Sequence, residues 1–314
     1  MSSTRQMAVN GIEMLVREQG DGPLVLLCHG WPELSYSWRH QLTALADAGY
    51  RVAAPDMRGF GATSAPAAIE AYTIFHHVGD MVALVGALGE KQAVIIGHDW
   101  GAPVAWHAAL FRPDVFTAVG GLSVPPPRRG PALPLETLRQ QGVTNFYWQY
   151  FQEPGVAERE FEQDVDFTMR AAFSKGFSAT GMSQFLQPGF GFLGDRTIAR
   201  PLPPWITEAD VDLYAAEFAR TGFRGGLNWY RNIDRNWELL AAFAGAKVTV
   251  PALYLVGELD LTLAFRGAKE LIANLAHFVP RLRQTIMLHG CGHWTQQERA
   301  EEVSATMIEF LRAL

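Results

Sequence analysis

Short apolar runs alternate with longer amphipathic runs in the first third of this 314-residue chain. A short apolar run is typical of a buried strand, and a longer amphipathic run is typical of a helix. Their alternation indicates the α/β class, in which a mostly parallel central sheet carries helices on both faces. The predicted strands are residues 23–28, 51–55, 91–97 and 117–124, and the predicted helices are residues 35–49, 73–88 and 100–111.

A proline-rich stretch, SVPPPRRGPALP at residues 123–134, ends this alternation, because it can continue neither a helix nor a central strand. The residues after it favour helices, one of them framed by a capping box at Thr207 and Asp210 and by Gly222 at its end. Strand-like runs return at residues 247–260 and 283–290, and residues 297–314 favour a last helix. We therefore expect one α/β domain, residues 1–125 and 241–314, that is interrupted by a helical cap, residues 126–240.

The net charge of −6 gives no electrostatic reason to expect nucleic acid or an anionic membrane surface as a partner. The N-terminal sequence MSSTRQMAVNG lacks the apolar core of a secretory signal, and no run of about 18 apolar residues predicts a membrane span. A cytoplasmic location is expected. The two cysteines, Cys28 and Cys291, then favour buried free thiols in a reducing compartment. The alternative is a metal site formed by Cys28-His29 and Cys291-x-His293, but neither pair has the spacing of a zinc site.

The sequence GHDWG at residues 97–101 lies between a predicted strand and a predicted helix. Such a turn has the form of a nucleophile elbow, in which small residues let strand and helix approach and the central side chain is exposed above the sheet. Here the central residue is Asp99, whose charge is also favourable near a helix N-terminus. Asp99 is therefore a candidate nucleophile, and the alternative is a simple helix cap.

Two further polar side chains follow predicted strands in the order acid then histidine. Asp260 follows PALYLVGEL, and His293 stands in GCGHW after TIML, so both are expected at the carboxyl edge of the sheet. Glu258 is a weaker candidate for the acid. The loop His29-Gly30-Trp31-Pro32 follows another strand, and we assign the amides of Trp31 and Trp100 to an oxyanion hole. A cis Trp31-Pro32 bond would help to point the first amide.

These residues resemble the epoxide hydrolases of the α/β-hydrolase fold. HGWPE, GHDWGA, YFQEPGVAE, GFRGGLNWYRN and CGHW stand in that family's order from residue 29 to residue 294. The resemblance implies two catalytic tyrosines, Tyr147 in FYWQYFQEPG and Tyr230 in LNWYRN. Trp148-Gln149 departs from the family's usual Gln-Leu, which leaves Tyr150 as the alternative first tyrosine. The phosphatase domain that precedes some animal members is not expected.

The implied reaction explains why a carboxylate stands in the elbow. A carboxylate is already charged at neutral pH, so Asp99 can attack a ring carbon and form an alkyl-enzyme ester. The two phenols, which stay protonated at neutral pH, would activate the epoxide oxygen. His293, oriented by Asp260, would activate the water that hydrolyses the ester. The partners are then a small-molecule epoxide and water, with no metal and no organic cofactor.

Two other functions fit parts of the same pattern. A haloalkane or haloacid dehalogenase also uses an aspartate nucleophile, and Trp100, Trp148 and Trp229 could bind a halide. The tyrosine motifs weigh against it. A non-enzymatic small-molecule receptor on this scaffold would not need nucleophile, acid and histidine together.

Overall fold

The computed structural model describes residues 3–174, 185–186, 188–197 and 201–314, and the chain divides into two compact units. The sheet unit comprises Met1–Ser64, Ile74–Pro127 and Ala246–Leu314, and the helical unit comprises Ala65–Thr73 and Arg128–Gly245. The sequence expectation placed the short segment Ala65–Thr73 with the sheet, whereas the structure groups it with the helices. One reason is that the side-chain amide of Asn232 donates to the carbonyl of Ile69 at 2.7 Å.

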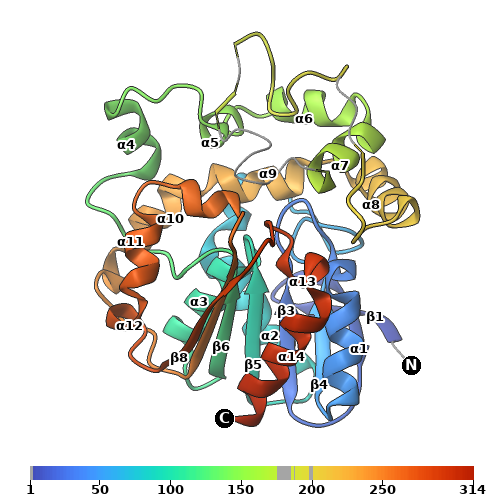
Figure 1. Cartoon of the computed structure of the whole chain (residues 1–314), viewed down its shortest axis with the longest axis vertical. Helices are drawn as coiled ribbons and strands as arrows, with labels where there is room; N and C mark the ends of the chain where they lie inside the picture. Colours follow the sequence, from blue (N-terminus) through green and yellow to red (C-terminus); the bar gives the residue numbers. More distant parts are fainter. Residues whose placement is uncertain (1–2, 175–184, 187, 198–200) are drawn as a thin grey trace. The chain divides into compact units, whose positions relative to one another are not determined.

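Eight strands form a single sheet in the order β1-β2-β4-β3-β5-β6-β7-β8 (Figure 1). Their bounds are Ser3–Val9 (β1), Ile12–Gln19 (β2), Leu24–Cys28 (β3), Arg51–Pro55 (β4), Ala93–His98 (β5), Phe116–Leu122 (β6), Ala252–Gly257 (β7) and Leu282–Leu288 (β8). Strands β4, β3, β5, β6, β7 and β8 are parallel to one another. At one edge, β2 pairs antiparallel with β4, and β1 pairs antiparallel with β2. The predicted mostly parallel sheet is confirmed.

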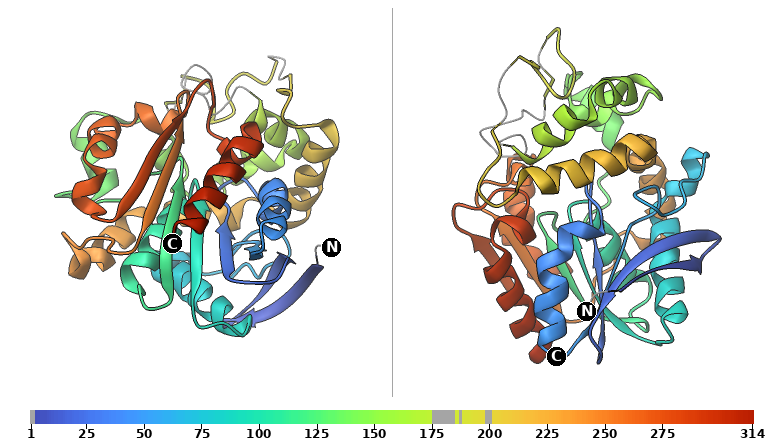
Figure 2. Two further views of the ribbon diagram at one scale, coloured as in Figure 1. Left: turned by 60° about the horizontal axis from the view of Figure 1, so that its bottom comes forward. Right: turned by 90° about the vertical axis from the view of Figure 1, so that its right-hand side faces the viewer.

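Helices cover both faces of this sheet. Their bounds are Ser35–Trp38 (η1), Arg39–Asp47 (α1), Ile74–Ala87 (α2), Gly101–Phe111 (α3), Leu261–Ala264 (η5), Ala268–Ala273 (α11), Leu275–Phe278 (α12), Thr295–Glu298 (α13) and Ala300–Arg312 (α14). Figure 2 shows α1 and α14 side by side on one face, where Leu42 and Met307 pack on Val25 and Leu27. Because side chains alternate along a strand, Cys28 points to the other face and meets Met81 of α2.

The helical unit contains seven α-helices in its described part. Their bounds are Pro134–Gln140 (α4), Tyr147–Tyr150 (α5), Val156–Glu162 (α6), Val165–Phe173 (α7), Glu208–Thr221 (α8), Arg224–Arg231 (α9) and Ile233–Leu239 (α10), with short 3₁₀ turns at Ile69–Tyr72 (η2) and Leu240–Phe243 (η4). The predicted frame of α8 is confirmed: Thr207 and Asp210 cap each other's backbone, and Gly222 ends the helix with a φ of 68°. Residues 175–184, 187 and 198–200 of the expected helical region lie outside the described residues.

Two predicted elements differ from the structure in their extent. The strand expected over 247–260 begins only at Ala252, because Pro251 has no N–H to donate to a neighbouring strand. The helix expected from residue 297 begins at Ala300, after the short helix α13. The N-terminal hairpin of β1 and β2, joined at Asn10-Gly11, was not predicted.

Candidate active site

The carboxyl ends of four parallel strands meet at one edge of the sheet. His98 at the end of β5 pairs with Leu122, the last residue of β6. Gly257 at the end of β7 pairs in the same way with Leu288 of β8. The residues that follow these strands are therefore neighbours, although they are far apart in the chain.

Asp99 occupies a tight turn between β5 and α3. Its backbone is left-handed, with a φ of 50°, which is uncommon for a residue other than glycine. The turn also requires glycine on both sides, because a Cβ at Gly97 would overlap the carbonyl of Gly101, and one at Gly101 would overlap the carbonyl of Cys28. This is the geometry of a nucleophile elbow, and a simple helix cap does not require it.

The loop after β3 presents a backbone amide to this carboxylate. The N–H of Trp31 donates to Oδ1 of Asp99 at 2.8 Å. The Trp31-Pro32 peptide bond is cis, the form that would help to point this amide. Trp100, the other residue assigned to the oxyanion hole, directly precedes the first turn of α3.

His293 lies between two carboxylates. Its Nδ1 is 3.0 Å from Oδ1 of Asp260, and its Nε2 is 3.5 Å from Oδ2 of Asp99. Asp260 is fully buried, and its Oδ1 also accepts the amide N–H of Thr262 at 2.9 Å. Burial alone lowers the pKa of His293, but the charges and hydrogen bonds of Asp260 and Asp99 raise it well above its usual value. The three side chains of the predicted triad are thus brought together.

Glu258, the weaker candidate for the acid, points elsewhere. Its carboxylate lies 2.7 Å from Nδ1 of the exposed His289 and accepts the amide N–H of Gly290 at 2.9 Å. Asp260 is therefore the acid that reaches His293.

A second buried pair, which the sequence patterns did not predict, lies beside the elbow. Glu33 and His98 are both fully buried, and Nδ1 of His98 is 2.9 Å from Oε2 of Glu33. The other ring nitrogen of His98 is 2.8 Å from the backbone carbonyl of His293. The side-chain amides of Gln296 and Gln297 also donate to Glu33, at 3.1 and 2.9 Å. This network holds the backbone of His293, and its one signal in the sequence is that Glu33 and His98 stand inside the motifs HGWPE and GHDWGA.

The helical unit brings the two predicted tyrosines together. Tyr147 on α5 and Tyr230 on α9 are both buried, and their ring centroids are 5.8 Å apart in an edge-to-face arrangement. The alternative, Tyr150, donates its hydroxyl to Oε2 of Glu160 at 2.8 Å. Burial and the charge of Glu160 raise the pKa of Tyr150 above its usual range. Because the hydroxyl of Tyr150 already donates to Glu160, Tyr147 is favoured as the first of the two predicted tyrosines.

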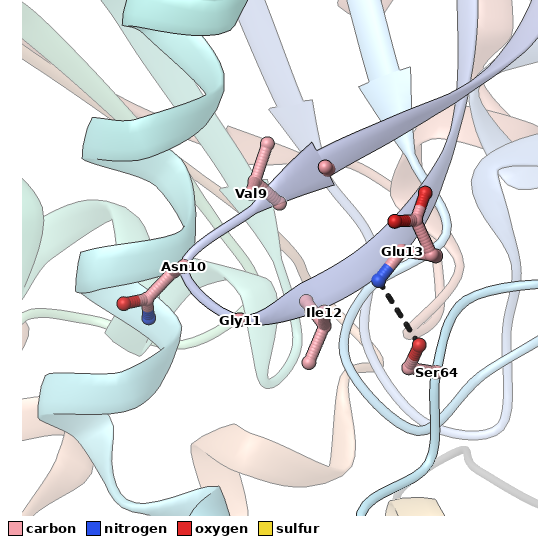
Figure 3. A pocket seen from close by; sticks show the side chains of 7 residues that line it. Val9, Asn10, Gly11, Ile12, Glu13 and Ser64 are labelled. Atoms are coloured by element: carbon pink, nitrogen blue, oxygen red, sulfur yellow. Dashed lines mark hydrogen bonds between the residues drawn. The ribbon is translucent and has the colours of Figure 1, made fainter.

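Two other features of the sheet unit do not add to this site. Cys28 and Cys291 are free and buried, and burial raises the pKa of both thiols. In the described part of the chain, no group of three or more His, Cys, Asp or Glu side chains is placed to hold a metal ion. A hollow beside the β1–β2 turn contains none of the triad residues, and within it the amide of Glu13 donates to Oγ of Ser64 (Figure 3).

Comparison with known proteins agrees with this geometry. A family profile described as the alpha/beta hydrolase fold matches residues 23–186. The chain is 44% identical to epoxide hydrolase A of Mycobacterium tuberculosis, over 99% of this chain and 97% of that protein. It is also 44% identical to epoxide hydrolase 1 of Siraitia grosvenorii, over 98% of this chain and 97% of that protein.

Solved structures give the same result. The crystal structure of epoxide hydrolase A from Mycobacterium thermoresistibile is similar with a TM-score of 0.91 and 47% identity, over 99% of this chain and 98% of the other. The structure of potato (Solanum tuberosum) epoxide hydrolase I is similar with a TM-score of 0.91 and 38% identity, over the whole of both chains.

Proposed function

The chain belongs to the epoxide hydrolases of the α/β-hydrolase fold, and from this premise we propose that it makes vicinal diols through an ester on Asp99. The observation that carries the proposal is the triad geometry. A carboxylate in a nucleophile elbow lies 3.5 Å from a histidine that a second, buried carboxylate holds at 3.0 Å. The substrates are a small-molecule epoxide and water.

In the first step, Oδ2 of Asp99 attacks a ring carbon of the epoxide. A carbon–oxygen bond forms, the ring bond to the epoxide oxygen breaks, and its electron pair stays on that oxygen. Tyr147 and Tyr230 donate hydrogen bonds to this oxygen, and one of the phenols transfers its proton. The product is a hydroxyalkyl ester of Asp99.

In the second step, His293 removes a proton from water, and the hydroxide adds to the carbonyl carbon of the ester. The amides of Trp31 and Trp100 stabilise the tetrahedral oxyanion. When the intermediate collapses, the diol oxygen leaves and takes the proton from His293. The carboxylic acid of Asp99 then loses its proton, which restores the phenol of the first step.

The test is to trap the ester by removing the base. We expect His293→Gln to gain the mass of one styrene oxide on Asp99, because the ester forms but is not hydrolysed. The matched control is His107→Gln, which replaces another buried histidine, on α3, whose Nδ1 is 2.7 Å from the carbonyl of Pro103. Intact mass spectrometry with peptide mapping makes the measurement. Diol formation at the normal rate without an adduct would reject the mechanism.

A halide-release assay beside the diol assay separates the dehalogenase alternative. The relatives named above are epoxide hydrolases, and they support diol formation. No described helix combines the length and the apolar character that a membrane crossing needs. The cytoplasmic location stays a prediction.

A further inference from the structure

Ser123, the first residue of the proline-rich boundary SVPPPRRGPALP, contacts His293. It follows β6 directly, is fully buried, and its Oγ lies 3.1 Å from Nδ1 of His293. The same nitrogen is 3.0 Å from Oδ1 of Asp260. Two oxygen atoms therefore surround Nδ1, while Nε2 lies on the side of Asp99.

The backbone of Ser123 is held in an unusual conformation. Its φ is 69°, in the left-handed region that favours glycine. Its N–H donates to the carbonyl of Leu255 at 2.8 Å. Its carbonyl accepts the hydroxyl of the buried Tyr254 at 2.7 Å and that of Thr262 at 3.3 Å. A strained backbone conformation of this kind persists only where several contacts hold it. Here the three hydrogen bonds hold it, and the conformation directs the hydroxyl of Ser123 toward the triad.

The chemistry of the base explains why this hydroxyl matters. To accept a proton from water, Nε2 must carry a lone pair, so the ring proton must stay on Nδ1. Acceptors around Nδ1 favour that tautomer and fix the plane of the ring. Burial raises the pKa of Asp260, but His293, the Thr262 amide and the Ser123 hydroxyl lower it below its usual value. The hydroxyl of Ser123 can thus accept a hydrogen bond from Nδ1 beside the carboxylate of Asp260.

We propose that Ser123 is a positioning residue of the second step, which holds His293 in the tautomer and ring plane needed to activate water. The proposal rests on the proposed function. It predicts that loss of the hydroxyl slows hydrolysis of the ester but not its formation, because Asp99 attacks the epoxide without help from His293.

The test compares two variants that both lack the hydroxyl. Ser123→Ala keeps a Cβ at the left-handed position, whereas Ser123→Gly relieves that strain. Rapid mixing of each variant with styrene oxide measures the two steps separately. We expect the rate of ester formation to stay within about twofold of the wild-type rate. We expect the rate of ester hydrolysis to fall by about 10-fold, the lower end of the range for loss of a residue that supports a catalytic group. The ester should then accumulate during turnover. The control is Ser37→Ala, which removes another buried hydroxyl, one with no hydrogen-bond partner among the described residues.

Three results would overturn the proposal. One is an unchanged hydrolysis rate in both variants. Another is an equal loss in ester formation and hydrolysis. The third is normal hydrolysis in Ser123→Gly with slow hydrolysis in Ser123→Ala, which would assign the effect to the backbone. If the ester is absent even from His293→Gln, the proposed function itself has failed. If the ester forms in His293→Gln but hydrolysis is normal in both serine variants, only the role of Ser123 is rejected.

Discussion

The amide of Trp31 donates a 2.8 Å hydrogen bond to Oδ1 of Asp99, so one carboxylate oxygen is already engaged before any substrate arrives. The free oxygen, Oδ2, is the one closer to His293 and the one expected to attack. In the proposed mechanism, Oδ1 then becomes the carbonyl oxygen of the ester and faces the amide that stabilises its negative charge.

This relationship depends on the absence of a side chain at residue 30. A Cβ at Gly30 would overlap the Cβ and Oδ1 of Asp99. We expect Gly30→Ala to displace the carboxylate and to slow ester formation at least about 10²-fold, because a small misplacement of a reacting group is costly. The control is Gly86→Ala on α2, where an added Cβ has no neighbour within 4 Å. It should keep full activity and unfold in urea with a free energy equal to the wild type or about 0.4–1 kcal/mol higher.

The three tyrosines should respond differently to loss of the hydroxyl. Tyr147→Phe and Tyr230→Phe remove a proton donor, and each is expected to lower kcat/KM for styrene oxide by about 10²-fold, the lower end for general acid catalysis. The double variant should be nearly inactive. Tyr150→Phe removes the hydrogen bond to Glu160 and should keep turnover within about threefold of the wild type, since it takes no part in the chemistry. A large loss of activity in Tyr150→Phe with little loss in Tyr147→Phe would instead assign the first catalytic tyrosine to Tyr150.

The assignment of Asp260 as the acid of the triad can be tested by comparison with Glu258, the weaker candidate. Asp260→Asn keeps the size of the side chain but removes the charge that supports His293, so ester hydrolysis should fall by about 10⁴-fold, as in other triads. Glu258→Gln loses only a contact with the exposed His289 and should leave hydrolysis unchanged. Single-turnover decay of the ester makes the comparison. Rapid decay in Asp260→Asn would remove Asp260 from the mechanism.

The pKa of His293 should fall when Asp99 is neutralised. Burial lowers this pKa, Asp260 raises it, and Asp99 raises it further. Ester formation removes the charge of Asp99, so the imidazole loses a cause of its raised pKa at the step in which it must act as a base. Asp99→Asn imitates this neutral state, and asparagine tolerates the left-handed backbone.

An NMR titration of the imidazole should therefore give a lower pKa for His293 in Asp99→Asn than in the wild type. His98, whose ring centroid is 4.9 Å from that of His293, serves as the internal reference. Since only the neutral imidazole accepts a proton, ester hydrolysis should slow as the pH falls through the pKa of the esterified enzyme. An identical pKa in both proteins would contradict this coupling.

The part of the fold that positions the site was predictable from the sequence. Asp99, Asp260 and His293 each follow an apolar run, and parallel strands bring such turns to one edge. The hairpin of β1 and β2 was missed because β1 is mostly exposed and shows no clear alternation. Its Asn10-Gly11 turn, with φ values of 45° and 77°, is a recognised hairpin signal that could have revealed it.

The supporting contacts of the triad could not be predicted in the same way. Ser123 touches His293 because β6 and β8 both pair with β7, and that register is absent from the local pattern. A serine followed by one valine and three prolines carries no mark of a catalytic neighbour. Glu33 and His98 likewise meet only after β3 and β5 have paired.

Strands β6 and β7 are adjacent in the sheet, although the long segment Arg128–Gly245 separates them in the chain. During translation Asp99 therefore emerges from the ribosome first, Tyr147 and Tyr230 next and His293 last, so the sheet edge that carries the triad is complete only after β7 and β8 have been made.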